Sequence, residues 1–260
     1  EKINMIDSLY IAETGMQSQQ RLIDVISNNI ANASTPGFKQ SHVNFVDLVV
    51  EPKINANGEA EQLGLQGLGV QVDSVGMDFS LGELKQTNNA FDLAINGAGF
   101  IEVEGTNGDL LYTRAGRLRL NDEGFITTTQ GYKLSAGVQV PPDAKSFSVS
   151  KSGEVSITLQ GEDGPVTLGN IGLVNFHNPS AMVAVGDNLF RASNDSGHAI
   201  YTEPGQNGTG ELIQGFTELS NVSMTEEMVN LMLAQRGYQL NARIIQVSDQ
   251  IMETINNLRR

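Results

Sequence analysis

Both ends of the chain carry apolar residues at helical spacing. In residues 5–32 and 229–258, apolar side chains recur every three or four positions. The first seam consists of Leu9, Ala12, Met16, Ile23, Ile26 and Ile30, with Gln19 at one step; the second consists of Val229, Leu233, Leu240, Ile244, Val247, Ile251, Ile255 and Leu258, with Gly237 at one step. One helix cannot cover its own apolar stripe, so each seam requires a partner. The sequence therefore predicts two long helices that pair as a coiled-coil-like stalk.

Signals for the ends of these helices support that prediction. Asn32 tolerates the left-handed conformation and Pro36-Gly37 enforces a turn, so the first helix, which begins near residues 5–9, should end near Asn32. Ser223, with Glu226 three positions later, forms a capping box at the start of the last helix.

The middle of the chain follows a different pattern. From residue 91 to about 219, short apolar runs alternate with turn signals such as Asn96-Gly97 and Gln206-Asn207-Gly208, which is typical of antiparallel strands. Residues 43–50 read as a strand or an extended arm, and the Gly-, Asn- and Glu-rich residues 51–69 as a flexible loop or long hairpin tip. We therefore expect a multi-domain α+β chain with a central antiparallel β domain.

The predicted domains have the following boundaries. Residues 5–37 and 221–260 form a discontinuous terminal helical domain, residues 38–90 an extended arm with a long hairpin or loop, and residues 91–220 the central β domain.

Composition excludes several classes of function. A net charge of −14 and a pI near 4.5 deny the chain the basic surface that nucleic-acid binding needs. The absence of cysteine excludes disulfides, thiolate metal sites and cysteine nucleophiles. No run is long enough for a transmembrane helix, so no membrane insertion is predicted. The N-terminus also lacks the features of a signal peptide, so the chain either stays inside the cell or leaves without cleavage.

The sequence offers little for catalysis. The three histidines lack metal-ligand spacing, and no Gly-x-Ser-x-Gly nucleophile elbow occurs. Glu102 and Glu104 share a strand face, which we interpret as a solvated face rather than a glycosidase pair. The glycine-rich residues 63–69 lack the Lys-Ser/Thr pair of a phosphate-binding loop. These residues therefore predict no metal site, while the sequence alone leaves a Ser-His-Asp triad open.

Three motifs occur in order along the chain. The first is Asn-Asn-Ile-Ala-Asn-Ala-Ser-Thr-Pro-Gly-Phe-Lys at 28–39, and the second is Asp-Leu-Ala-Ile-Asn-Gly at 92–97 followed by Tyr-Thr-Arg-Ala-Gly at 112–116. The third begins with Ser-Asn-Val at 220–222 and continues with Glu-Glu-Met-Val-Asn at 226–230 and Gln-Arg-Gly-Tyr at 235–238. Together they resemble the bacterial flagellar basal-body rod protein family over nearly the whole chain, with the closest resemblance to subunits of the distal rod. A proximal rod or hook-type subunit is the alternative within the family, and a secreted β-rich binding protein is the alternative from another class.

The resemblance implies a structural subunit that polymerises with itself into a hollow drive shaft. This shaft would transmit torque from motor to hook and leave a channel for export. The implied location is the flagellar basal body, from the periplasm to the outer membrane, reached without a cleaved signal peptide. The implied partners are other copies of the chain, other rod proteins, the hook protein and the surrounding basal-body rings. The resemblance implies no catalytic residue, no metal and no cofactor, so we expect no enzyme.

The candidate assembly interface follows from the apolar seams and from the family resemblance. Periodicity alone leaves open whether the seams pair within one chain or between chains, but further apolar residues beside each seam favour contacts between chains. From the seams we expect the interface to contain Leu9, Met16, Ile23, Ile26, Ile30, Leu233, Leu240, Ile244, Val247, Ile251, Ile255 and Leu258. Asn28, Asn29 and Asn32 at the end of the first helix complete the expected interface. The resemblance suggests intersubunit hydrogen bonds for Asn28 and Asn29, whereas for Asn32 a helix cap is favoured.

Overall fold

The computed structural model describes residues 2–50, 66–106, 108–160 and 164–258, and the chain forms two compact units. Unit 1 comprises Glu1–Ala31, Ser41–Gly76 and Ser223–Arg260, and unit 2 comprises Asn32–Gln40 and Met77–Val222. The residues of the predicted arm, 38–90, are thus divided between the two units. Most of the loop predicted over 51–69 lies outside the described residues.

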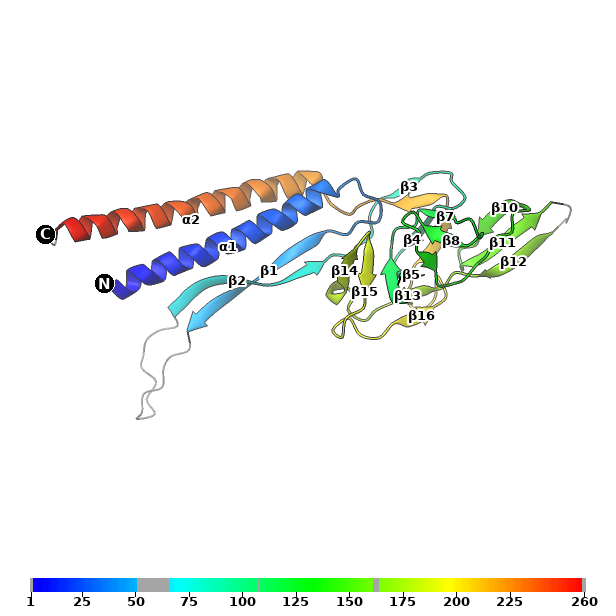
Figure 1. Cartoon of the computed structure of the whole chain (residues 1–260), viewed down its shortest axis with the longest axis horizontal. Helices are drawn as coiled ribbons and strands as arrows, with labels where there is room; N and C mark the ends of the chain where they lie inside the picture. The colour runs from blue at the N-terminus through cyan, green and yellow to red at the C-terminus, as the bar shows by residue number, and fades with distance from the viewer. Residues whose placement is uncertain (1, 51–65, 107, 161–163, 259–260) are drawn as a thin grey trace, which may run out of the picture. The chain divides into compact units, whose positions relative to one another are not determined.

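Unit 1 contains both long helices. α1 spans Lys2–Ala31 and α2 spans Met224–Leu258, and the two pack side by side in antiparallel directions (Figure 1). α1 begins earlier than predicted but ends beside Asn32, and α2 begins directly after Ser223. Within the described residues, neither helix has an apolar stretch long enough to cross a membrane.

Two strands complete unit 1. β1 (Ser41–Val50) and β2 (Gln66–Met77) pair in a two-stranded sheet, and β1 packs against α1. The hydroxyl of Ser18 in α1 donates a hydrogen bond to the carbonyl oxygen of Val70 in β2 at 3.2 Å. The strand predicted over 43–50 is therefore confirmed, and it belongs to the helical unit.

Unit 2 is the central antiparallel β region that the turn signals predicted. Its largest sheet has seven strands in the order β14-β15-β6-β5-β9-β8-β7; β10-β11-β12 form a second sheet, and β13–β16, β17–β4 and β18–β3 form pairs. The bounds are β3 Leu84–Gln86, β4 Leu93–Asn96, β5 Ile101–Glu104, β6 Leu110–Thr113, β7 Leu118–Leu120, β8 Ile126–Thr128, β9 Lys133–Leu134, β10 Ala144–Val149, β11 Glu154–Leu159, β12 Pro165–Asn170, β13 Leu173–Asn175, β14 Val183–Gly186, β15 Leu189–Arg191, β16 Ile200–Thr202, β17 Glu211–Gln214 and β18 Phe216–Glu218, with a short 3-10 helix at Pro179–Ala181.

The core of unit 2 has an aliphatic and an aromatic part. The aliphatic part is built from alternate strand residues such as Ile101 and Val103 of β5. In the aromatic part, Phe79 packs edge-to-face on Phe100, with ring centroids 5.0 Å apart. The opposite face of β5 carries Glu102, whose carboxylate accepts a hydrogen bond from a tyrosine hydroxyl, that of Tyr201, at 2.7 Å. That bond raises the pKa of Tyr201, with burial as the next cause.

Candidate assembly site

α2 leaves one apolar face exposed along most of its length. At the predicted seam positions, between 46% and 62% of each side chain is exposed. These residues, which we call the α2 assembly face, are Val229, Leu233, Leu240, Ile244, Val247, Ile251 and Ile255. The side chain of Leu258, the last predicted member, lies outside the described part of the chain.

A different face of α2 packs on α1. Its buried members are Glu227, Ala234 and Ser248. Half-buried Leu231, Gly237, Asn241 and Ile245 lie between them, so that the whole series advances in steps of three or four residues. A Cβ at Gly237 would lie 3.2 Å from Cδ of Gln19 in α1, so the two helices approach closely where α2 lacks a side chain. Small residues let helix backbones approach in this way.

The seam of α1, by contrast, is covered. Ala12 and Ile26 are buried, and the expected interface residues Leu9, Met16, Ile23 and Ile30 are half-buried. The two helices therefore pack together, but the expected pairing of one apolar seam with the other is not what joins them. The seam of α2 stays largely exposed within the described residues.

Asn29 joins three elements of unit 1. It is 1% exposed, its amide nitrogen Nδ2 donates to the carbonyl oxygen of Ser41 at 2.8 Å, and its Oδ1 accepts from the backbone N–H of Ser41 at 3.0 Å. Nδ2 also lies 3.3 Å from Oε2 of Glu227 in the first turn of α2. These hydrogen bonds lie within the chain, and bonds of Asn29 between subunits stay a prediction.

The other two asparagines lie in different surroundings. Asn28 is exposed at the end of α1, so its role between subunits stays a prediction. Asn32 follows α1 directly, and its Oδ1 accepts a hydrogen bond from the hydroxyl of Thr35 at 3.2 Å. The backbone N–H of Thr35 also donates to the carbonyl oxygen of Asn32 at 3.0 Å, which closes the turn after the helix.

Asn29→Ala should destabilise unit 1, whereas Ser27→Ala, at an exposed position of the same helix, should not. Removal of the Asn29 amide leaves both main-chain groups of Ser41 without this buried partner, and unsatisfied buried polar groups cost about 1–3 kcal/mol. Urea denaturation followed by circular dichroism at a helix wavelength measures the difference. Equal midpoints for the two variants would contradict the bonding described for Asn29.

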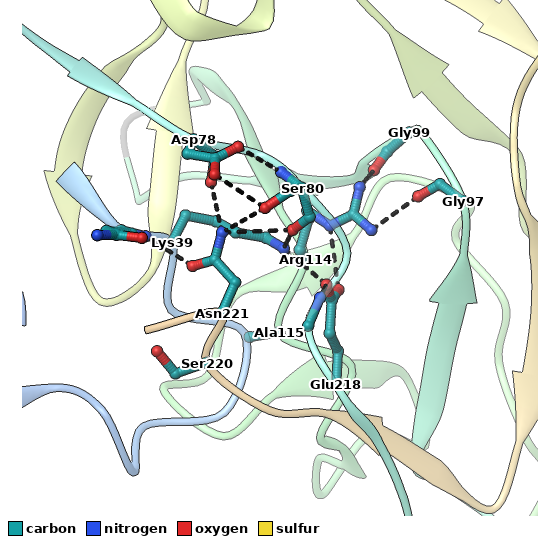
Figure 2. A network of polar contacts seen from close by, with 12 residues as sticks. Lys39, Asp78, Ser80, Gly97, Gly99, Arg114, Ala115, Glu218, Ser220 and Asn221 are labelled. Carbon is teal, nitrogen blue, oxygen red and sulfur yellow. Dashed lines mark hydrogen bonds and ion pairs between the residues drawn. The ribbon is translucent and has the colours of Figure 1, made fainter. Parts of the chain in front are cut away.

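Unit 2 contains a buried cluster of three charged side chains, Lys39, Arg114 and Glu218 (Figure 2). Nζ of Lys39 lies 2.6 Å from Oε1 of Glu218, and Nε of Arg114 lies 3.0 Å from Oε2. None of the three side chains is more than 1% exposed. We call this cluster the buried ion triad.

Main-chain oxygens accept further hydrogen bonds from the two cations of the triad. Lys39 Nζ donates to the carbonyl oxygen of Ser80 at 2.6 Å, and the guanidinium of Arg114 donates to the carbonyl oxygens of Gly97 and Gly99 at 2.8 and 3.0 Å. Two cations nevertheless share one carboxylate. Burial lowers the pKa of Lys39, the charge of Arg114 lowers it further, and Glu218 opposes the shift.

The triad lies where the three sequence motifs meet. The backbone N–H of Gly37 donates to the carbonyl oxygen of Glu218 at 2.9 Å, and the backbone N–H of Gln40 donates to Oδ1 of Asn221 at 2.8 Å. Gly37 has a φ of +73°, and a Cβ there would lie 2.8 Å from Cα of Ala115. Glycine is thus needed both for this conformation and for this close contact.

Sequence reasoning assigned no role to the triad. Lys39 and Arg114 stand inside quoted motifs, and Glu218 lies just before the third. The available signal was a charged residue at the end of a short strand, β18, but glutamate is usually exposed, so this signal alone does not indicate a buried ion pair.

The lowered pKa of Lys39 should make stability depend on alkaline pH. The unfolded chain keeps this proton up to the ordinary pKa of 10.5, whereas the folded chain releases it at lower pH. Between these values the unfolded state binds more protons, so this residue's contribution to the free energy of unfolding rises with pH. Relative to Lys39→Met, the native chain should gain stability from neutral pH towards 10.5 in urea denaturation. If the difference in free energy of unfolding between the native chain and Lys39→Met stayed constant with pH, or changed in favour of Lys39→Met as pH rises, the lowered pKa of Lys39 would be contradicted.

Three protein-family models match separate parts of the chain and together define its class. Residues 9–39 match the family model described as "Flagella basal body rod protein". Residues 94–157 match "Flagellar hook protein FlgE/F/G D1 domain", and residues 213–258 match "Flagellar basal body rod FlgEFG protein C-terminal". These three matches define a protein of the flagellar rod and hook class.

Full-length relatives narrow the class to one family. The flagellar basal-body rod protein FlgG of Buchnera aphidicola subsp. Schizaphis graminum is 40% identical over 260 residues, which cover 98% of this chain and 100% of the relative. The FlgG proteins of Caulobacter vibrioides and Bacillus subtilis are each 38% identical with the same coverage. The chain belongs to the FlgG family of flagellar basal-body rod proteins. It is a structural protein of the rod rather than an enzyme, as the resemblance implied.

Proposed function

We propose that this chain is a subunit of the distal rod that polymerises with copies of itself into a hollow shaft. The shaft transmits torque from the motor to the hook and leaves an export channel. The observation that carries the proposal is the α2 assembly face, an apolar stripe that runs along a long helix and is not covered within the described chain. Pairing of this stripe with helices of neighbouring subunits supplies the coiled-coil-like contact that one chain alone does not make.

The size of this face favours assembly. Burial of the exposed half of one large aliphatic side chain stabilises a contact by about 1 kcal/mol, and seven such residues share the face. Large continuous apolar surfaces on soluble proteins mark interaction sites. Contributions spread along the helix also suit a shaft under torque, because many small contacts resist shear together.

The proposed surroundings follow from the family. The subunit lies in the part of the basal body that spans the periplasm to the outer membrane, and it is exported without a cleaved signal peptide. Its further partners are other rod proteins, the hook protein and the surrounding rings. The names of the relatives, which are basal-body rod proteins, support this placement.

Electron microscopy of basal bodies tests the proposal. Cells that lack this chain should produce basal bodies that stop short, without a distal rod or hook, and a plasmid copy of the gene should restore both. Complete basal bodies in the deletion strain would rule out the proposed function.

A further inference from the structure

The first turns of α2 carry a second exposed row, which consists of methionines. Met224, Met228 and Met232 are spaced four residues apart, so their side chains lie on one side of the helix. They are 50%, 56% and 54% exposed. Met228 and Met232 directly precede Val229 and Leu233, so this methionine row adjoins the start of the α2 assembly face.

Two other methionines are buried, whereas Met252 near the end of α2 is 44% exposed. Met77 and Met182 belong to the aromatic cluster of unit 2 and are 8% and 4% exposed. The sequence contains no cysteine and no tryptophan, so methionine is its most readily oxidised residue. Because susceptibility to oxidation follows exposure, an oxidant in solution should reach the methionine row well before the buried residues.

The relevant chemistry is oxygen transfer from a peroxide. A lone pair of the thioether sulfur attacks one peroxide oxygen, an S–O bond forms and the O–O bond breaks. The departing hydroxide takes up the proton of the transferred oxygen and leaves as water. The sulfur is thereby oxidised by two electrons, and the peroxide is reduced by two. The product, methionine sulfoxide, is polar where the thioether was apolar.

We infer that Met224, Met228 and Met232 form a peroxide-sensitive site of the free subunit, and that sulfoxides at this site prevent its addition to the rod. The inference rests on the proposed function, because its consequence concerns assembly. Polar oxygens beside Val229 and Leu233 would have to lose water when the assembly face is covered, and an uncompensated polar group opposes such burial.

The first experiment maps the site. The purified full chain is treated with hydrogen peroxide, and peptides are quantified by mass spectrometry over time. Each methionine of the row should be oxidised at least about ten times faster than Met77 and Met182, because oxidation follows exposure. Equal rates at exposed and buried positions would overturn the inference.

The second experiment tests the consequence in cells. A chain with Met224→Gln, Met228→Gln and Met232→Gln imitates the polar sulfoxide, and the corresponding three leucine substitutions keep the row apolar and resistant to oxidation. All chains compared, including the otherwise native one, also carry Met252→Leu, because Met252 is exposed beside Ile251 of the assembly face. The leucine chain should build rods, also under peroxide that stops assembly of the native chain, while the glutamine chain should fail to build them. Normal rods from the glutamine chain would overturn the inference and leave the proposed function intact. Complete basal bodies in the deletion strain would instead remove the proposed function.

Discussion

Glu218→Gln should cost unit 2 about 3–5 kcal/mol of its free energy of unfolding, because removal of one partner from a buried ion pair leaves uncompensated charge. Here two buried cations, Lys39 and Arg114, lose their shared anion. Glutamine has nearly the same shape as glutamate, so the packing changes little. Urea denaturation followed by near-ultraviolet circular dichroism of the tyrosines measures the loss.

Two control variants separate this effect from a general effect of charge. Glu211→Gln removes the acidic partner of an exposed ion pair with Lys151 at 3.1 Å, and such surface pairs contribute about 0–1 kcal/mol. Lys39→Met removes one of the two cations and leaves Arg114 paired with Glu218, so its cost should be smaller than that of Glu218→Gln. Equal losses for the Glu218 and Glu211 variants would contradict the account of the triad.

Ile244→Asp should abolish rod assembly while leaving the subunit folded. The isoleucine lies in the middle of the α2 assembly face and is 46% exposed, so an aspartate there is solvated in the free chain. In an assembled rod the same carboxylate would be buried in an apolar contact without a partner, at a cost of several kcal/mol for each subunit. Swimming assays and electron microscopy of basal bodies give the readout.

Gln246→Asp provides the matched control. Gln246 is also exposed, lies two residues from Ile244, and points to another side of α2. Cells with this variant should swim and build complete basal bodies. If cells with Ile244→Asp also built intact rods, the α2 assembly face would not be the interface.

The fold was predictable where local pattern decides it. The three- and four-residue spacing from Leu9 to Ile30 and from Val229 to Ile255 indicated two long helices, and the turn signals indicated the antiparallel region. The helix face that α2 turns to α1 was not predictable in this way. That face contains Ala234, Asn241 and Ser248, small or polar residues that a search for apolar spacing passes over.

The buried clusters were less accessible to sequence reasoning. Lys39, Arg114 and Glu218 lie far apart in the sequence, and only the folded strands bring them together. Charged side chains are usually solvated, so nothing local marks these three as buried. For Asn29, a position in a motif could not distinguish a bond to a neighbour from the bonds to Ser41 that the structure shows.

Thiol labelling tests the central claim, that neighbouring subunits cover the α2 assembly face in the rod. The chain has no cysteine, so Leu240→Cys introduces a single thiol at a position that is 62% exposed in the subunit. A maleimide should modify this thiol rapidly in the free chain, and in isolated basal bodies only after denaturation. Equally rapid labelling in intact basal bodies would show that this face remains open in the rod and would contradict the account.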